Sequence, residues 1–176
     1  MKEMSVVGFA GKIGSGKTTA AFYLCDKYFY HRTRFADPLK RMMRALGCSE
    51  AEIDGEKKHE PCALFGGKTP REAMQLLGTE WGRTLDPDIW VRAWARDLRS
   101  HRIVVDDVRF PNELAAVHEL GGKVIGLKRG EPSAQFNSHA SEAIAFEPDV
   151  WIDNNGTTEE LYKNIEAFLK LERPTA

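Results

Sequence analysis

The fold predicted from this sequence depends on one stretch, Val6-Val7-Gly8-Phe9-Ala10-Gly11-Lys12-Ile13-Gly14-Ser15-Gly16-Lys17-Thr18-Thr19. Its first five residues are apolar enough for a buried strand, and its last residues suit the start of a helix. Between them, Gly11, Gly16, Lys17 and Thr18 satisfy the pattern G-x-x-x-x-G-K-[ST]. In that pattern the backbone N–H groups of the loop surround a nucleotide's phosphates, the lysine reaches the terminal phosphates and the threonine binds Mg²⁺. The stretch therefore predicts a strand, a phosphate-binding loop and a helix.

The residue types in this loop suit an anion. Glycines adopt positive φ and let the backbone approach a phosphate without interference from a Cβ atom. The helix that opens after Gly16 adds oriented N–H groups and the positive end of its dipole. A phosphate site alone leaves open whether the phosphate is transferred, hydrolysed or only sensed, so the rest of the chain must decide.

Strand and helix patterns alternate along the rest of the chain, as a parallel α/β sheet requires. The further strand candidates are residues 34–36, 101–107, 123–127 and 150–153. We therefore predict a three-layer α/β fold, with a five-stranded parallel sheet and helices on both of its faces. With 42% hydrophobic residues in 176, the chain is sized for one domain, and we assign residues 1–176 to it.

The overall charge and the cysteines limit the partners and the location. A net charge of −1 provides no basic field for a nucleic-acid backbone, so nucleic acid is not the expected partner. No apolar run is long enough to span a membrane, and the N-terminus lacks a signal pattern. Cys25, Cys48 and Cys62 are odd in number and widely spaced, as in reduced cytosolic proteins. We expect a cytoplasmic protein, in the host cytoplasm if a phage encodes it.

The region between the second and third strand candidates is expected to be mostly helical. Asp37-Pro38 ends the second candidate and caps a helix, and the Asp37 side chain could serve as the cap or face the ligand at the carboxyl end of the strand. Residues 49–68 are polar and are predicted to lie outside the core. Thr69-Pro70-Arg71-Glu72 is a capping box that starts the next helix. On that helix a buried stripe of Ala73, Leu76 and Leu77 is predicted opposite a polar face of Arg71, Gln75 and Thr79.

Aromatic and basic residues near the end of that helix are candidates for binding a nucleotide. Arg83 follows closely and offers a second arginine for an anion. Trp90 begins the following helix and could stack on a base, although aromatic residues at helical spacing are more often part of a core. The sequence leaves both interpretations of Trp90 open.

Two acidic residues end the third strand candidate. Ile103-Val104-Val105 is a continuous apolar run, typical of a strand buried on both faces, and Asp106-Asp107 follows it. A carboxylate at this end of a strand beside the phosphate loop can hold Mg²⁺. Arg109 comes next and is expected to bind a phosphate. Residues 128–146 are predicted to form a lid, and Arg129 is the only arginine among them.

Taken together, these motifs resemble the phage-type deoxynucleoside monophosphate kinases, a branch of the P-loop nucleoside monophosphate kinases that is also similar to dephospho-CoA kinase. The resemblance covers nearly the whole chain. It rests on residues 11–18, 35–40, 75–79 with Arg83, 107–113 and 152–156. It implies a P-loop kinase fold in which residues 38–100 form a helical acceptor-binding insertion and residues 128–146 form the lid.

The resemblance also implies a set of site residues. The ATP-binding residues would be Gly11, Lys12, Gly14, Ser15, Gly16, Lys17, Thr18, Thr19, Asn154, Asn155 and Gly156, the last three near the adenine. The residues that bind the acceptor, a deoxynucleoside monophosphate (dNMP), would be Asp37, Arg71, Gln75, Thr79, Trp81, Arg83, Trp90, Asp107, Arg109 and Glu113. Mg²⁺ would lie on Thr18 and Asp107, with Asp106 as the alternative carboxylate, and the catalytic residues would be Lys17, Asp37, Arg109 and Arg129.

The expected reaction is ATP + dNMP → ADP + dNDP. One alternative keeps the fold but phosphorylates a hydroxyl group, on a modified base in phage DNA or on dephospho-CoA, with Asp37 as the base. Another is a nucleotide-dependent switch or ATPase, although no glutamate directly follows Asp107 to act as an ATPase base. The accepted bases, the choice between ribose and deoxyribose, and the oligomeric state stay open, with a homodimer as one option.

Overall fold

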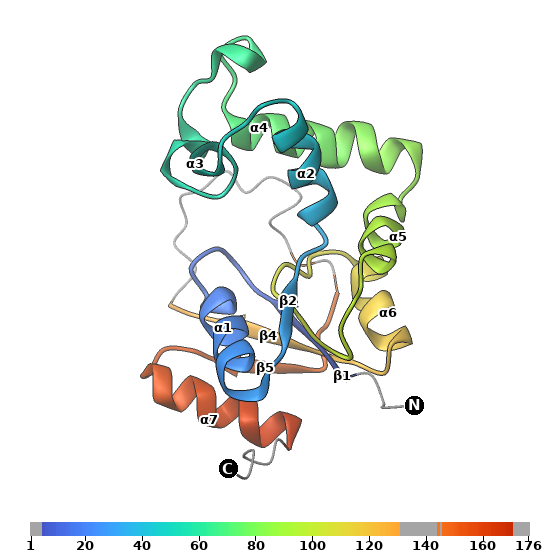
Figure 1. The fold of residues 1–176 in the computed structure, drawn as a ribbon. Helices are drawn as coiled ribbons and strands as arrows, with labels where there is room; N and C mark the ends of the chain where they lie inside the picture. The colour runs from blue at the N-terminus through green and yellow to red at the C-terminus, as the bar shows by residue number, and fades with distance from the viewer. Residues whose placement is uncertain (1–4, 131–143, 145, 171–176) are drawn as a thin grey trace. The chain divides into compact units, whose positions relative to one another are not determined.

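The computed structural model describes residues 5–130, 144 and 146–170. The chain divides into two compact units (Figure 1). The first comprises residues 1–34 and 99–176, and the second comprises Phe35–Leu98. The predicted helical insertion, residues 38–100, spans nearly the same part of the chain as the second unit. Most of the predicted lid, at 131–143 and 145, lies outside the described residues.

The first unit contains the predicted five-stranded parallel sheet, which the structure confirms. Its strands are β1 (Ser5–Ala10), β2 (His31–Thr33), β3 (Arg102–Val105), β4 (Lys123–Lys128) and β5 (Val150–Asp153). Their order is β2-β3-β1-β4-β5, and every neighbouring pair is parallel. The carboxyl ends of β1, β3 and β4 therefore meet at one edge, which is where ligands bind in sheets of this kind.

Helices cover both faces of the sheet, as predicted. The helices of this unit are α1 (Lys17–Tyr28), α6 (Pro111–Glu119) and α7 (Thr158–Leu169) (Figure 1). Successive residues of a strand point to opposite faces. Phe9 accordingly joins a buried cluster with Leu24 of α1 and Ile165 of α7. A Cβ atom on Gly8 would instead lie 3.5 Å from a methyl group of Val117 in α6.

The second strand begins earlier than the sequence suggested. We predicted residues 34–36, but β2 is His31–Thr33, which pairs with β3 from Ile103 to Val105. Phe35 made the later stretch look like a strand because it is apolar. It is buried in the second unit instead, where its ring centroid lies 4.6 Å from that of Trp94.

The second unit is helical. Its elements are α2 (Asp37–Ala45), α3 (Glu50–Ile53), η1 (Glu56–His59), η2 (Ala63–Phe65), α4 (Pro70–Gln75), η3 (Leu76–Arg83) and α5 (Ile89–Arg96). Leu39, Met43, Cys48, Ile53 and Trp90 form its buried core. Ile53 and Cys48 show that the polar stretch 49–68 and its border contribute to this core, so the prediction that 49–68 lies outside the core was wrong. The first residue of α2 is Asp37, and its N-cap position belongs to Ala36.

The predicted helix after Thr69 changes its form midway. The capping box is confirmed, because the Thr69 amide donates to the Glu72 carboxylate at 2.8 Å and the Glu72 amide donates to the Thr69 hydroxyl at 3.1 Å. From Leu76 onward, however, the backbone is a π-helix, a rare form whose hydrogen bonds join residues five apart and which often occurs at functional sites. Leu76, the first residue of this segment, is exposed, although the α-helical pattern predicted a buried side chain.

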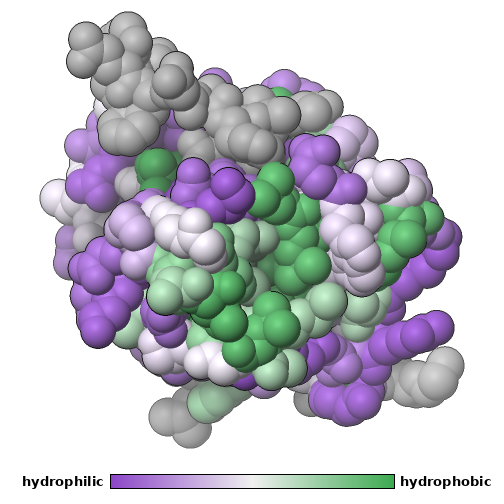
Figure 2. All heavy atoms as spheres, turned by 90° about the horizontal axis from the view of Figure 1, so that it is seen from above, coloured by the Kyte–Doolittle hydropathy of each residue, from purple (hydrophilic) through white to green (hydrophobic). Residues whose placement is uncertain are grey.

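Several large apolar side chains are exposed. In the space-filling view of Figure 2, apolar residues (green) appear at the surface between polar ones (purple). Those in the second unit are Met42, Leu46, Leu64, Leu76, Trp81 and Leu85. Within the described part of the chain, no helix combines the length and the apolar character needed to cross a membrane.

Candidate functional site

The phosphate-binding loop connects β1 to α1, and glycine is required at two of its positions. Gly16 has φ +101°, and a Cβ atom there would lie 2.4 Å from the side-chain nitrogen of Asn154. A Cβ atom on Gly11 would lie 2.5 Å from both the Ser15 hydroxyl and the Leu127 carbonyl oxygen. The loop is therefore packed tightly against neighbouring side-chain and backbone atoms. Its backbone leads directly into the N-terminus of α1, where anions bind favourably.

Asn154 supports the phosphate loop from the end of β5. Its side-chain amide donates a hydrogen bond of 2.9 Å to the Ser15 carbonyl, and the residue is 6% exposed. The side-chain amide of Asn154 thus supports the loop, and its predicted place near the adenine stays a prediction. The next residue, Asn155, accepts a 2.6 Å hydrogen bond from the Gly130 amide.

A pocket of about 230 Å³ borders the turn for which adenine binding was predicted. It lies between the end of β5 and α7, and its lining includes Asp153, Gly156, Thr157, Lys163 and Asn164. The side chains here are mainly polar, so they can pair with the edge of a base. The adenine position itself stays a prediction.

Lys17 lies at the start of α1 with its ammonium group against the loop. Its Nζ atom donates to the carbonyl oxygens of Gly11 and Lys12 at 2.7 and 2.8 Å. Burial and the nearby positive charge of Arg109 lower the pKa of Lys17 to about 8, while Asp106 and Asp107 act in the opposite direction. The structure therefore brings these four charged groups of the first unit together, as the sequence predicted for an anion site.

The lowered pKa of Lys17 predicts that ATP binding takes up a proton in alkaline solution. Near pH 9 the lysine is mostly neutral before binding, since its pKa is about 8. The anionic phosphates favour the ammonium form and raise this pKa, so binding takes up as much as about one proton. Near pH 7 the lysine is already charged, and the uptake through it falls toward zero.

Isothermal titration calorimetry in buffers of different ionisation enthalpy measures this uptake. Lys17→Arg is the control, because arginine stays charged at both pH values. Equal proton uptake by the parent protein and this variant near pH 9 would assign the effect to another group.

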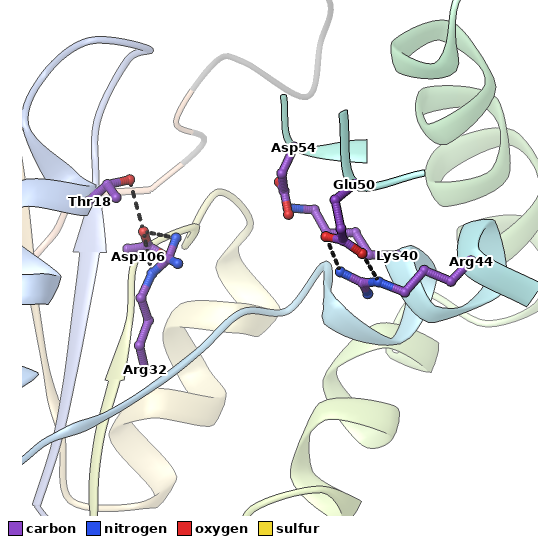
Figure 3. A network of polar contacts seen from close by, with 7 residues as sticks. All are labelled: Thr18, Arg32, Lys40, Arg44, Glu50, Asp54 and Asp106. Atoms are coloured by element: carbon purple, nitrogen blue, oxygen red, sulfur yellow. Dashed lines mark hydrogen bonds and ion pairs between the residues drawn. The ribbon is translucent and has the colours of Figure 1, made fainter. Parts of the chain in front are cut away.

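Asp106 is the carboxylate that reaches the phosphate loop (Figure 3). Its Oδ2 atom accepts a hydrogen bond of 3.0 Å from the Thr18 hydroxyl. The same oxygen accepts hydrogen bonds of 3.0 and 2.6 Å from Nε and Nη2 of Arg32. We predicted Asp107 as the metal carboxylate, but the structure pairs Thr18 with Asp106, the residue that directly follows β3. The sequence alone could not separate them, because both end the same strand.

The donor set around Asp106 fits Mg²⁺. The residue is 4% exposed, and among the described residues its Oδ1 atom has no hydrogen-bond partner. A buried carboxylate oxygen without a partner is costly unless a cation or a water molecule satisfies it. Hard oxygen ligands from one carboxylate and one hydroxyl, completed by water and phosphate, are typical of Mg²⁺ sites. Asp106 and Thr18 could therefore hold Mg²⁺.

Glu113 holds the backbone that carries Arg109. Its buried carboxylate accepts hydrogen bonds from the amides of Arg109 at 2.7 Å and Phe110 at 3.2 Å. This arrangement caps α6. The structure shows this backbone contact of Glu113, and its predicted contact with the acceptor stays a prediction. Arg129 is exposed and directly follows β4.

The other predicted acceptor residues lie in the second unit. Arg71 and Gln75 are on α4, and the π-helix η3 carries Thr79, Trp81 and Arg83. Trp81 is 45% exposed, so its ring is available to a ligand. Arg83 donates a hydrogen bond of 3.1 Å to the Pro87 carbonyl. Asp37 is partly exposed at the start of α2.

Trp90 is a core residue, which is the more frequent of the two roles that the sequence left open. The residue is 6% exposed, and its indole N–H donates a hydrogen bond of 2.8 Å to the Gly78 carbonyl of η3. A Cβ atom on Gly82 would lie 2.4 Å from the indole ring, so the missing side chain makes room for Trp90. Trp90 thus supports the helix that carries Trp81, whose ring centroid lies 6.5 Å away.

Arg32 is the residue of this site that the sequence did not reveal. It lies on β2, 74 positions before Asp106, and belongs to none of the motifs. A strand next to β3 places a side chain within reach of Asp106, but this is apparent only once the strand order is known.

Comparison with known proteins agrees with the motifs. A family model described as deoxynucleotide monophosphate kinase matches residues 68–165. A protein of Acanthamoeba polyphaga mimivirus, whose name assigns it provisionally to the deoxynucleotide monophosphate kinases, is 37% identical over 183 residues. That match covers 92% of this chain and 94% of the relative. An uncharacterised protein, ORF77 of Ictalurid herpesvirus 1, is 28% identical over 80% of this chain and 60% of its own length.

Solved structures show the same fold. A shikimate kinase from Bacteroides thetaiotaomicron is 12% identical with a TM-score of 0.56, over 96% of this chain and 99% of that one. The protein TT1252 from Thermus thermophilus is 17% identical with a TM-score of 0.50, over 96% and 98% of the two chains. At these identities the likeness concerns the fold alone.

Proposed function

The chain belongs to the deoxynucleotide monophosphate kinase family, and on this premise we propose that it transfers the γ-phosphoryl group of ATP to a dNMP. It is a phosphotransferase, and ATP is its phosphoryl donor. The observation that carries the proposal is the cluster of Lys17, Asp106, Asp107 and Arg109 around a phosphate loop. The family model and the mimivirus relative confirm the family resemblance inferred from the motifs.

Phosphoryl transfer between nucleotides depends on positioning and charge neutralisation. The loop and the N-terminus of α1 bind the donor's phosphates, and Lys17 follows the γ-phosphoryl group as charge moves onto the leaving ADP. Mg²⁺, held by Thr18 and Asp106, would supply further neutralisation of the phosphate oxygens. No general base is required, because the attacking phosphate of the acceptor is already ionised.

The acceptor is bound by arginines and by one exposed aromatic ring. We assign its phosphate to Arg71, Arg83 and Arg109, since arginine binds phosphate through two parallel hydrogen bonds. We assign its sugar and base to Gln75, Thr79 and Trp81. The exposed face of Trp81, backed by Trp90, supports this assignment. Asp37 stays assigned to the acceptor phosphate or its Mg²⁺, and Arg129 to the transferring phosphate.

A panel of acceptors tests the proposed function. ADP formation from ATP is measured alone, with each common dNMP, with each ribonucleoside monophosphate, and with dephospho-CoA. We expect at least one dNMP to raise the rate by about 10²-fold or more over ATP alone, a typical effect of correct positioning. A rate that no mononucleotide changes would indicate a switch or an ATPase. Stimulation by dephospho-CoA alone would indicate a hydroxyl kinase.

Arg109→Ala is expected to impair the use of the acceptor dNMP far more than the binding of the donor ATP. Loss of a charged hydrogen-bonding partner for the dNMP phosphate should reduce kcat/KM for dNMP by about 10²-fold, while the Kd of ATP changes less than about threefold. Steady-state kinetics with varied dNMP and direct ATP titration measure the two effects. Arg102→Ala is the matched control, because Arg102 donates to the Tyr28 carbonyl and lies outside the site. An equal loss of ATP affinity in Arg109→Ala would mean that the two nucleotide subsites are reversed.

A further inference from the structure

Arg32 makes an asymmetric contact with the carboxylate of Asp106. An arginine fork usually pairs its two N–H groups with the two oxygens of a carboxylate. Here Nε and Nη2 of Arg32 both donate to Oδ2, at 3.0 and 2.6 Å. Thr18 donates to the same oxygen at 3.0 Å. Oδ2 therefore accepts three hydrogen bonds, while Oδ1 has none among the described residues.

This asymmetry fixes the orientation of a buried charge. The Asp106 side chain is 3% exposed, so its negative charge needs a compensating partner. Lys17 does not fill that role directly, because its ammonium donates to the carbonyls of Gly11 and Lys12. The guanidinium of Arg32 is thus the cation that contacts Asp106, and it contacts the oxygen that also binds the phosphate-loop helix through Thr18.

Arg32 is itself held in place from two sides. Its backbone pairs with Val104 of β3, the strand that ends immediately before Asp106. Its guanidinium lies 5.1 Å from the ring centroid of Phe22, on the helix α1 that also carries Thr18. A guanidinium over an aromatic face is attracted by the ring. The arginine is therefore positioned by the strand that directly precedes Asp106 and by the helix that carries Thr18.

We propose that Arg32 is a positioning residue of the magnesium site: it holds Oδ2 of Asp106 against Thr18, so that Oδ1, which has no hydrogen-bond partner among the described residues, would be the oxygen that takes the cation. This inference rests on the proposed function. Partners that orient a metal ligand typically change metal affinity by about 10- to 100-fold when they are removed. Arg32 is expected to act on the cation and to leave the binding of the nucleotide without cation largely unchanged.

The test measures cation affinity directly, without turnover. Mn²⁺ is titrated into the complex with a non-hydrolysable ATP analogue, AMP-PNP, and bound Mn²⁺ is followed by electron paramagnetic resonance. AMP-PNP affinity without divalent cation is measured separately by calorimetry. For Arg32→Ala we expect the Mn²⁺ affinity of this complex to fall about 10- to 100-fold, with the cation-free AMP-PNP affinity within about threefold of the parent. Arg32→Lys should restore part of the loss, since it retains the charge without the fork.

Two further variants make the result decisive. Arg102→Ala removes another arginine of the sheet that donates to the Tyr28 carbonyl, and it should leave the Mn²⁺ affinity unchanged. In the double variant Arg32→Ala/Asp106→Asn, the losses should be less than additive, because Arg32 acts through Asp106. Unchanged Mn²⁺ affinity in Arg32→Ala, or an equal loss of cation-free AMP-PNP binding, would overturn the proposal. Because no acceptor is present, failure here is distinct from failure of dNMP to stimulate ADP formation.

Discussion

Replacement of Lys17 by alanine is expected to reduce kcat by about 10³-fold or more. Lys17 is the cation of the phosphate loop, and its Nζ atom lies within hydrogen-bond distance of the Gly11 and Lys12 carbonyls. Its position at the start of α1, where the loop meets the helix, suits it to follow the γ-phosphoryl group with a positive charge as the bond to ADP breaks. Initial rates of dNMP-dependent ADP formation at saturating substrates measure the effect.

The fold should survive this substitution. Burial of the Lys17 ammonium lowers its pKa. Without nucleotide, the charged lysine therefore decreases the free energy of unfolding. Thermal unfolding of Lys17→Ala should therefore occur at or above the temperature of the parent protein. Lys123→Ala, which removes an exposed lysine paired with Asp149, serves as the activity control. Near-normal turnover in Lys17→Ala would refute the assignment of the loop as the catalytic phosphate site.

Asp106→Asn is expected to reduce kcat by about 10²- to 10³-fold, and Asp107→Asn by much less. Asparagine keeps the shape of Asp106 but removes the charge that fits Mg²⁺ and that pairs with Arg32. Steady-state rates with varied Mg²⁺ measure the difference, and the apparent Mg²⁺ requirement should rise only in Asp106→Asn.

Asp106→Asn should also lower the stability of the first unit. Removing one partner of a buried ion pair leaves the other charge uncompensated. The rates of the Asp106→Asn variant are therefore measured well below the unfolding temperature of that variant. If Asp107→Asn showed the larger loss and the larger Mg²⁺ requirement, the metal carboxylate would be Asp107, as the sequence first suggested.

Local chemistry made the phosphate loop and the sheet predictable. The eight residues from Gly11 to Thr18 suffice to predict phosphate binding, because each residue type in the pattern meets one requirement of a bound phosphate. The runs in β1 and β3 are continuously apolar, since both faces of those strands are covered. The capping box at Thr69 and Glu72 is likewise a short-range signal, and the structure contains it.

Features that depend on long-range packing were not predictable in the same way. An apolar residue such as Phe35 suits either a strand or a helical core. The predicted second strand was therefore placed three residues too late. Neither the π-helical turn from Leu76 nor the hydrogen bond from the buried Trp90 indole to the Gly78 carbonyl follows from a short-range pattern. Only the strand order shows that Arg32 reaches Asp106.

The identity of the product tests the central claim most directly. The protein is incubated with Mg²⁺, ATP labelled at the γ-phosphate and the best dNMP of the panel, and the nucleotides are separated by chromatography. The proposed function predicts that the label moves to the dNMP, with dNDP and ADP formed in equal amounts. Label released as inorganic phosphate while the dNMP stays unchanged would contradict it.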